Sequence, residues 1–213
     1  MDRRQVLGLG IGAGLALAAA RPAAAEPTPA AVLRDPDAPV LGNPEGDVTI
    51  VEFFDYQCGF CRRMHPVLRA ALARDPGLRL VMKDVPIFGP GSVHAARMAL
   101  AASVGPGTRT GATTGGGTGG GTDYARAVDA LMAGRGALSP ARVDRLLARA
   151  GLDVAGLRAG QGDARWSRLI RRNMEQAEDL GFTGTPAFVI GRVLYPGAMD
   201  GAMLDRLVAE ARG

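Results

Sequence analysis

A strand-like segment that runs directly into two cysteines constrains the fold of this chain more than any other feature. Residues 48–54 (VTIVEFF) are β-branched and aromatic, which predicts a buried strand. Cys58 and Cys61, the only cysteines, follow it, and residues 62–77 (RRMHPVLRAALARDPG) have the pattern of a helix and its end. Residues 78–89 (LRLVMKDVPIFG) begin as a second strand. Strand, helix and strand at this spacing predict a βαβ unit with parallel strands.

The remainder of the chain predicts helices and then a hairpin. Residues 91–180 carry several helical patterns, interrupted at 105–122 by a segment with nine Gly and six Thr, which we expect to be a flexible loop. Two strand-like runs in 186–197 meet at a tight turn, and an amphipathic helix follows.

These patterns predict an α/β fold: βαβ, a helical insertion over 91–180, then ββα. Residues 48–90 and 181–213 would form the two halves of one domain. Residues 26–47 carry five prolines and several turn residues, so we expect a lead-in without regular structure.

The first 25 residues predict an export signal. Arg3 and Arg4 precede an apolar run, and the small residues Ala23–Ala25 suit cleavage. The paired arginines fit both the Sec and the twin-arginine routes, and either route predicts a periplasmic location. Cleavage removes three Arg and one Asp, which lowers the formal net charge from +4 to +2. Because the basic residues are also scattered, we expect no nucleic-acid binding.

The two cysteines do not suit a zinc site or a structural disulfide. Zinc needs about four ligands, and the chain adds only His65 and His94, which lie outside the usual zinc-finger spacing. We therefore predict no metal site, although two thiolates alone can bind a soft ion such as Cu(I). A Cys-x-x-Cys disulfide closes a very short loop and would stabilise the fold little.

A redox couple has a physical basis at this position. A cysteine at the junction of strand and helix faces the free N–H groups of the first helical turn, which favour a thiolate at Cys58. Cys61 lies one turn further along and is less exposed, so it can resolve mixed disulfides. A pair of this kind tends to donate its disulfide to substrates.

Three segments together resemble the DsbA-like thiol–disulfide oxidoreductases of bacterial envelopes: VEFFDYQCGFCRRMHP, LRLVMKDVPIFGP and GTPAFVIG. The resemblance implies a thioredoxin-like fold with a helical insertion, and no cofactor. It implies that Cys58 is the nucleophile, that Cys61 is the resolving thiol, and that Thr185-Pro186 is the cis-proline loop beside the disulfide. Its partners would be partly folded exported proteins with thiols, and a membrane or periplasmic redox partner.

The resemblance further implies that Glu52 is a buried acid near the thiols. Lys83, the only lysine, falls on the neighbouring strand at the family's basic position, and we expect it to pair with Glu52. The alternative is that both are surface residues. The candidate substrate-binding residues are Gly59, Phe60, His65, Thr185 and Pro186. For His65 the alternative is packing on the helix.

The direction of electron flow stays open at this point. The dipeptide Gly59-Phe60 and the threonine before Pro186 resemble disulfide isomerases. Such isomerases, however, dimerise through an N-terminal region, and residues 26–47 are too few to form one, so we expect a monomer. We predict an oxidase that introduces or exchanges disulfides. An isomerase or reductase, or a copper-handling thiol protein without turnover, is the alternative.

Overall fold

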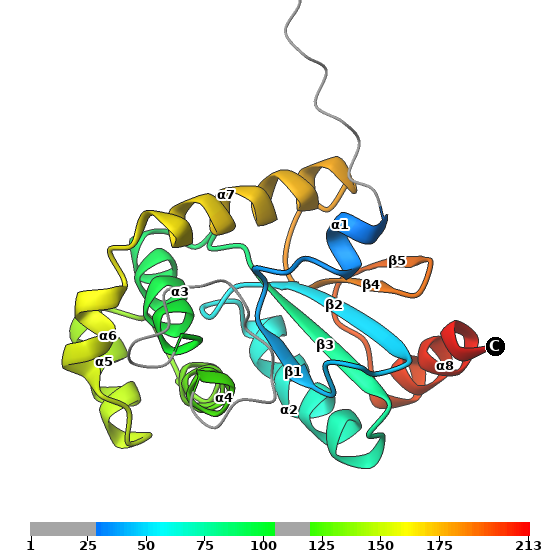
Figure 1. Cartoon of the computed structure of the whole chain (residues 1–213), viewed down its shortest axis with the longest axis horizontal. Coiled ribbons are helices and arrows are strands. Elements are labelled where there is room, and N and C mark those ends of the chain that lie inside the picture. The colour runs from blue at the N-terminus through cyan, green and yellow to red at the C-terminus, as the bar shows by residue number, and fades with distance from the viewer. Residues whose placement is uncertain (1–28, 105–119) are drawn as a thin grey trace, which may run out of the picture.

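The computed structural model describes residues 29–104 and 120–213, so the predicted export signal and most of the Gly/Thr-rich segment lie outside the described residues. Its centre is a five-stranded sheet in the order β1-β3-β2-β4-β5 (Figure 1). The parallel pair is β2 with β3, and the other three pairs are antiparallel. The strands are β1 (Val40–Gly42), β2 (Val48–Phe54), β3 (Leu78–Asp84), β4 (Ala187–Ile190) and β5 (Val193–Pro196). The predicted thioredoxin-like plan is therefore confirmed.

Helices cover both faces of this sheet. One face packs against α2 (Gly59–Arg74) and α8 (Gly201–Arg212), and the other packs against α1 (Pro29–Leu33) and α7 (Ala164–Asp179). The helices between β3 and α7 are α3 (Pro90–Ala102), α4 (Gly120–Met132), α5 (Pro140–Arg149) and α6 (Val154–Gly160). They lie at one end of the sheet in Figure 1. Among the residues 29–104 and 120–213, no helix is both long and apolar enough to cross a membrane.

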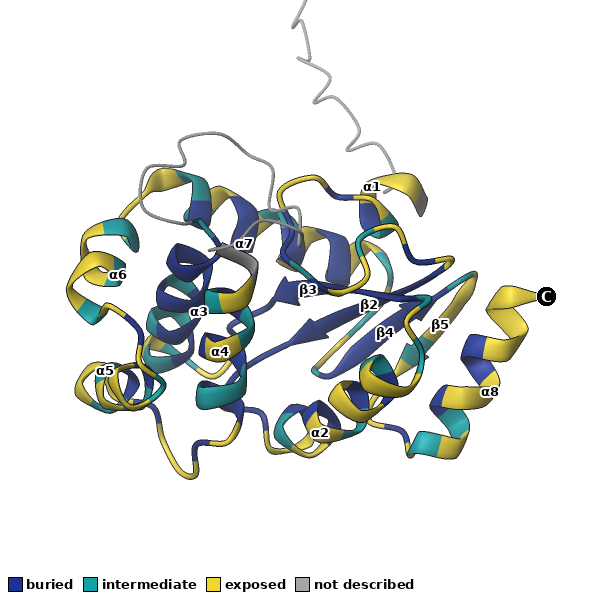
Figure 2. Ribbon diagram, turned by 60° about the horizontal axis from the view of Figure 1, so that its bottom comes forward, coloured by how far each residue is buried: buried dark blue, intermediate teal, exposed yellow. Residues whose placement is uncertain are grey.

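The central strands are buried on both faces, as Figure 2 shows by their uniform dark blue. Because side chains alternate along a strand, even-numbered residues such as Ile50 and Leu80 join the core beneath α2. Odd-numbered residues such as Val51 and Val81 join a smaller core beneath α1 and α7. This alternation decides which polar residues of β2 and β3 reach the cysteines.

The prediction that residues 26–47 hold no regular element is wrong. They contain the short helix α1 and the strand β1, which pairs with β3 through Val40 and Val81. Both elements are too short to give a periodic pattern, and they are stabilised by tertiary contacts. One such contact is a hydrogen bond from the Arg79 guanidinium to the Leu33 carbonyl (2.6 Å).

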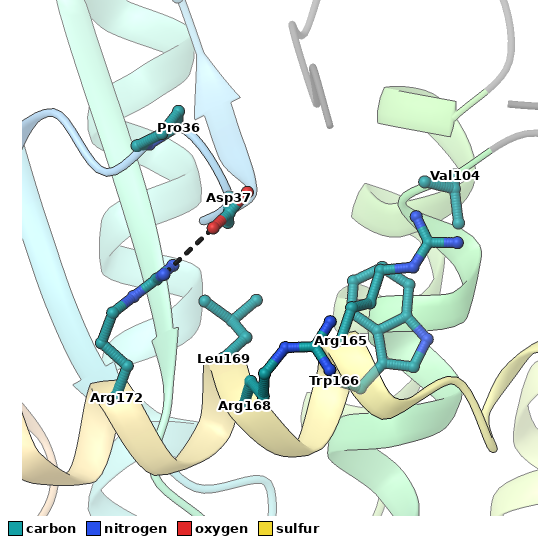
Figure 3. A pocket seen from close by; sticks show the side chains of 8 residues that line it. All are labelled: Pro36, Asp37, Val104, Arg165, Trp166, Arg168, Leu169 and Arg172. Atoms are coloured by element: carbon teal, nitrogen blue, oxygen red, sulfur yellow. Dashed lines mark hydrogen bonds and ion pairs between the residues drawn. The ribbon is translucent and has the colours of Figure 1, made fainter. Parts of the chain in front are cut away.

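A buried ion network fastens this lead-in to the sheet and to α7. The Lys83 ammonium donates to the Asp35 carboxylate, and both side chains are almost fully buried. Arg172 of α7 contacts the same carboxylate at 2.7 Å and Asp37 at 3.0 Å. Figure 3 shows Arg172 reaching Asp37 across a pocket whose wall also carries Arg165 and Arg168. The network thus joins three segments that are far apart in sequence.

Replacing Arg172 should weaken this attachment. We expect Arg172→Met to lower the free energy of unfolding by about 1–2 kcal/mol, because it removes charge-assisted hydrogen bonds to a buried carboxylate. Arg171→Met is the matched control, since that side chain is 64% exposed and its ion pair with Glu175 is long, at 3.9 Å. It should change the free energy of unfolding by less than about 0.5 kcal/mol. Urea denaturation measures both, and equal values would contradict the role given to the network.

Candidate active site

The cysteine pair lies where β2 ends and α2 begins. Cys58 is the N-cap of α2 with an extended backbone (φ −68°, ψ 118°), and its N–H donates to the Asp55 carbonyl at 3.1 Å. Its sulfur accepts the N–H of Cys61 at 3.4 Å. A cap of this kind aims an N–H group of the first turn at the sulfur, as the sequence predicted. Both residues are free thiols in the structure.

These donors change the acidity of Cys58. A hydrogen bond from the Cys61 side chain, together with the N–H groups of Cys61 and Phe60, lowers the pKa of Cys58 to about 5 against the opposing effect of burial. A cysteine with that pKa is a thiolate at neutral pH, and the thiolate is both the reactive nucleophile and the better leaving group. Cys58 therefore has the properties of the exchanging sulfur.

Cys61 is in the opposite state. Its side chain is fully buried, and burial raises the pKa of Cys61 far above that of an ordinary thiol, with further contributions from Cys58 and from the charge of Glu52. It therefore stays protonated when Cys58 is ionised. This difference between neighbouring sulfurs is what a resolving thiol needs.

The Thr185-Pro186 peptide bond is cis and lies directly against the cysteines. When protonated, the Cys58 thiol donates to the Thr185 carbonyl oxygen at 3.1 Å, although the two residues are 127 positions apart in the chain. The loop thus stands beside the exchanging sulfur, where the resemblance placed it.

Glu52 lies in the core on the α2 face of the sheet. It is 1% exposed, and neither carboxylate oxygen has a hydrogen-bond partner among the described residues. Burial, helped by the charge of Cys58, raises the pKa of Glu52 to about 8. The group can therefore hold or release a proton near neutral pH beside a buried thiol.

The expected pairing of Lys83 with Glu52 is wrong. In the sheet, Lys83 is opposite Phe53 and Glu52 is opposite Met82, so the two side chains lie on different faces. Lys83 pairs with Asp35 on the α7 face. Lys83 therefore joins β3 to the segment before β1 and does not pair with Glu52.

A second buried acid, which the sequence reasoning missed, lies on the Glu52 face. Asp84 ends β3, is 1% exposed, and has a pKa raised well above the usual range by burial and by the nearby charge of Asp55. Its charge also raises the pKa values of the buried hydroxyls of Tyr56 and Tyr124, after burial itself. A signal for it was present, because Asp84 alternates with Leu80 and Met82, whose apolar side chains face this core.

The candidate substrate-binding residues separate into two groups. Gly59 and Phe60 are exposed in the first turn of α2, and the Arg63 guanidinium lies 4.3 Å from the centroid of the Phe60 ring. A groove beside Phe60 is lined by Tyr195, Met203 and their neighbours. His65 is instead buried, and its Nε2 lies 2.7 Å from the Asp129 carboxylate of α4. It ties α2 to α4, which matches the packing alternative.

No three His, Cys, Asp or Glu side chains within residues 29–104 and 120–213 gather closely enough to hold a metal ion.

A family model described as thioredoxin matches residues 34–210 of this chain. Among solved structures, a thioredoxin-like oxidoreductase from Silicibacter pomeroyi DSS-3 is 38% identical, with a TM-score of 0.75 over 87% of this chain and 98% of that one. A periplasmic thioredoxin-like protein from Salmonella enterica serovar Typhimurium is 29% identical, with a TM-score of 0.72 over 86% of this chain and 94% of that one.

The thiol–disulfide exchange protein α-DsbA2 from Wolbachia pipientis is 25% identical, with a TM-score of 0.71 over 84% of this chain and 90% of that one. Curated relatives include the Na(+)/H(+) antiporter NhaA 1 of Salinispora arenicola, which is 27% identical over 179 residues. Those residues are 83% of this chain and 25% of the antiporter, so the chain spans about a quarter of the length of the curated relatives it matches.

Proposed function

The chain belongs to the thioredoxin family of thiol–disulfide oxidoreductases, and from this we propose that it oxidises thiols of exported, partly folded proteins with its Cys58–Cys61 disulfide. The observation that carries the proposal is the position of Cys58, whose sulfur caps the start of α2, accepts the Cys61 N–H at 3.4 Å and lies 3.1 Å from the Thr185 carbonyl oxygen. The donors at this position lower the pKa of Cys58 to about 5. Because a stable thiolate favours the reduced form of the pair, the oxidised form is a strong disulfide donor.

The exchange proceeds in two steps. A substrate thiolate attacks the Cys58 sulfur of the disulfide, which forms a mixed disulfide and releases Cys61 as a thiolate. A second substrate thiolate then attacks the substrate sulfur of that mixed disulfide and releases the Cys58 thiolate. The substrate loses two electrons and gains a disulfide, and the Cys58–Cys61 pair gains both electrons.

Glu52 serves the first step. The Cys61 thiolate is a poor leaving group because burial disfavours its charge, so it needs a proton as it leaves. Burial alone raises the pKa of Glu52 and favours its protonated form, so the carboxyl group can supply that proton. The same carboxylate accepts a proton when Cys61 is reoxidised by the redox partner.

The surface around Cys58 suits extended polypeptide segments. Phe60, Ile87 and Phe88, which we call the apolar rim, are 57%, 44% and 53% exposed. Exposed apolar side chains beside a reactive group mark a binding surface for apolar partners. Unfolded chains present apolar side chains that folded proteins bury, so they are the substrates that this surface favours. Periplasmic action is part of the proposal and is supported by the predicted export signal.

Equilibration of the reduced and oxidised protein with glutathione tests the direction of exchange. We expect a reduction potential nearer to about −120 mV than to about −270 mV, because the Cys58 thiolate stabilises the reduced form. The oxidised protein should also accelerate oxidation of a reduced, unfolded protein. A potential near about −270 mV would point to a reductase instead, and a protein that binds Cu(I) without accelerating oxidation would point to copper handling.

A further inference from the structure

The amide of Gln57, the residue before Cys58, joins three separate segments. Its Nε2 donates to the Phe88 carbonyl at 3.1 Å and to the Ser92 hydroxyl at 3.0 Å. Its Oε1 accepts the N–H of Leu138 at 2.7 Å. The active-site turn, the loop between β3 and α3, and the loop between α4 and α5 thus meet at one side chain. Both polar atoms of that amide therefore have hydrogen-bond partners.

The carboxylate of Asp55 contacts two of the same segments. One oxygen accepts the Gln57 N–H at 2.6 Å and the Ser92 hydroxyl at 2.7 Å, and the other accepts the Phe88 N–H at 3.0 Å. Asp55 and Ser92 are both essentially fully buried. The backbone N–H and carbonyl of Phe88 are therefore held by two side chains of the active-site turn. We call Asp55, Gln57 and Ser92 the Gln57 network.

The helical insertion is fastened to the active site at two further points. Arg62 donates to the Tyr56 carbonyl at 2.7 Å and to the Gly136 carbonyl at 3.2 Å, so it joins the start of α2 to the loop before α5. A Cβ atom at Gly91 would lie 2.0 Å from the carbonyl oxygen of Leu138, so α3 and this loop approach as closely as only glycine allows. The loop between α4 and α5 thus contacts the active-site loops directly.

This arrangement has a consequence for the apolar rim. Burying the exposed side chains of Ile87 and Phe88 would lower the free energy of the protein, because burial of apolar surface is favourable. The Gln57 network opposes that movement, since it holds both backbone polar groups of Phe88. It therefore keeps the loop that carries these two exposed apolar side chains against the active-site turn, where a substrate can cover them.

We propose that Gln57 is a positioning residue that holds the Phe88 side of the apolar rim against the helical insertion, and that the rim selects substrate cysteines with apolar neighbours. The inference rests on the proposed function and adds to it the class of substrate. Gln57 acts through Phe88 and does not touch the reacting sulfurs of the substrate. The insertion thereby takes part in substrate choice without contributing a reacting group.

The test compares two dithiol peptides that differ only in having Leu or Ser beside one cysteine. We expect the wild-type kcat/KM to favour the Leu peptide about tenfold, mostly through KM, because one apolar side chain is buried on binding. Gln57→Leu keeps the size of the side chain, removes its hydrogen bonds, and should reduce this preference to less than about twofold. Phe88→Ser, at an exposed position, should do the same and guards against a folding defect in the first variant.

Gln176→Leu is the matched control. It removes a similar bond, from Nε2 to the Ala31 carbonyl at 3.3 Å, on the opposite face of the sheet. It should lower the melting temperature but leave the peptide preference unchanged. An unchanged preference in Gln57→Leu and Phe88→Ser, or the same loss in Gln176→Leu, would overturn the inference. A wild-type protein that oxidises both peptides equally would also overturn it, whereas one that oxidises neither would contradict the proposed function itself.

Discussion

The reduced protein should react with iodoacetamide through one thiol, with a half-maximal rate near pH 5. The reason is the pKa of about 5 at Cys58, compared with about 8.5 for an ordinary cysteine. Cys61 should stay unreactive until the protein unfolds, because its thiol stays protonated and has no exposed surface, whereas Cys58 is ionised and keeps 3% exposure. Mass spectrometry of the alkylated protein over pH 4 to 9 gives both results. Cys58→Ser should lose this reaction and all turnover.

Two variants of Cys61 test the origin of the low pKa. Cys61→Ala removes the side-chain donor that contributes most to the shift and should raise the midpoint of alkylation well above pH 5. Cys61→Ser keeps a donor in the same place and should stay closer to the wild-type midpoint. A wild-type midpoint near pH 8.5 would contradict both the geometry of the N-cap and the oxidase proposal.

The same shift makes the stability of the reduced protein depend on pH. The pKa of Cys58 is lower in the folded than in the unfolded chain, so the thiolate stabilises the folded state fully above about pH 8.5. That stabilisation is lost as the pH falls through about 5. The oxidised protein has no thiolate. The free energy of unfolding of the reduced form, relative to that of the oxidised form, should therefore decline as the pH falls from about 8.5 to about 5.

The parts of the site that were predictable from the sequence are local. A β-branched run, two cysteines and a helical pattern adjoin one another in residues 48–77, and their order alone places Cys58 at a helix start. The approach of Thr185 to Cys58 spans 127 residues. It was expected only through the family resemblance, since no periodic pattern gives the contact.

The error over Lys83 has a simple physical cause. Successive side chains of a strand point to opposite faces, so a change of one residue in register moves a side chain to the other side of the sheet. Lys83 and Glu52 lie on neighbouring strands, but Lys83 is opposite Phe53. An inward-facing set that includes Leu80 and Met82 would have selected Asp84 as the residue on the Glu52 face.

The Gln57 network was not predictable for a different reason. Gln57 contacts residues that are 31, 35 and 81 positions away, and glutamine in a turn carries no pattern that names its partners. The same holds for the lead-in, where α1 and β1 depend on tertiary contacts. Short elements of this kind form because the rest of the fold is already present.

Glu52 should make the wild-type protein less stable as the pH rises, and Glu52→Gln should remove that effect. The pKa of Glu52 is raised to about 8 in the folded protein, whereas the unfolded chain ionises near 4.3. The folded state therefore holds one more proton between these values, so the stabilisation present below about pH 4.3 is lost as the pH rises through about 8. Relative to Glu52→Gln, the free energy of unfolding should fall by about 1.4 kcal/mol per pH unit over most of this range.

The rate of peptide oxidation should also depend on the proton that Glu52 supplies to Cys61. Glu52→Gln keeps the shape of the side chain but cannot protonate the leaving Cys61 sulfur, so we expect oxidation of a dithiol peptide to slow by about 100-fold at pH 7 while the Cys58–Cys61 disulfide still forms. Glu175→Gln, on an exposed part of α7, should change neither the rate nor the pH dependence of unfolding. In the oxidised protein the charge of Cys58 is absent, so the decline in stability should end at a lower pH than in the reduced protein. Identical unfolding profiles for wild type and Glu52→Gln in both redox states would show that Glu52 ionises normally, and the proton for Cys61 would then have to come from another group.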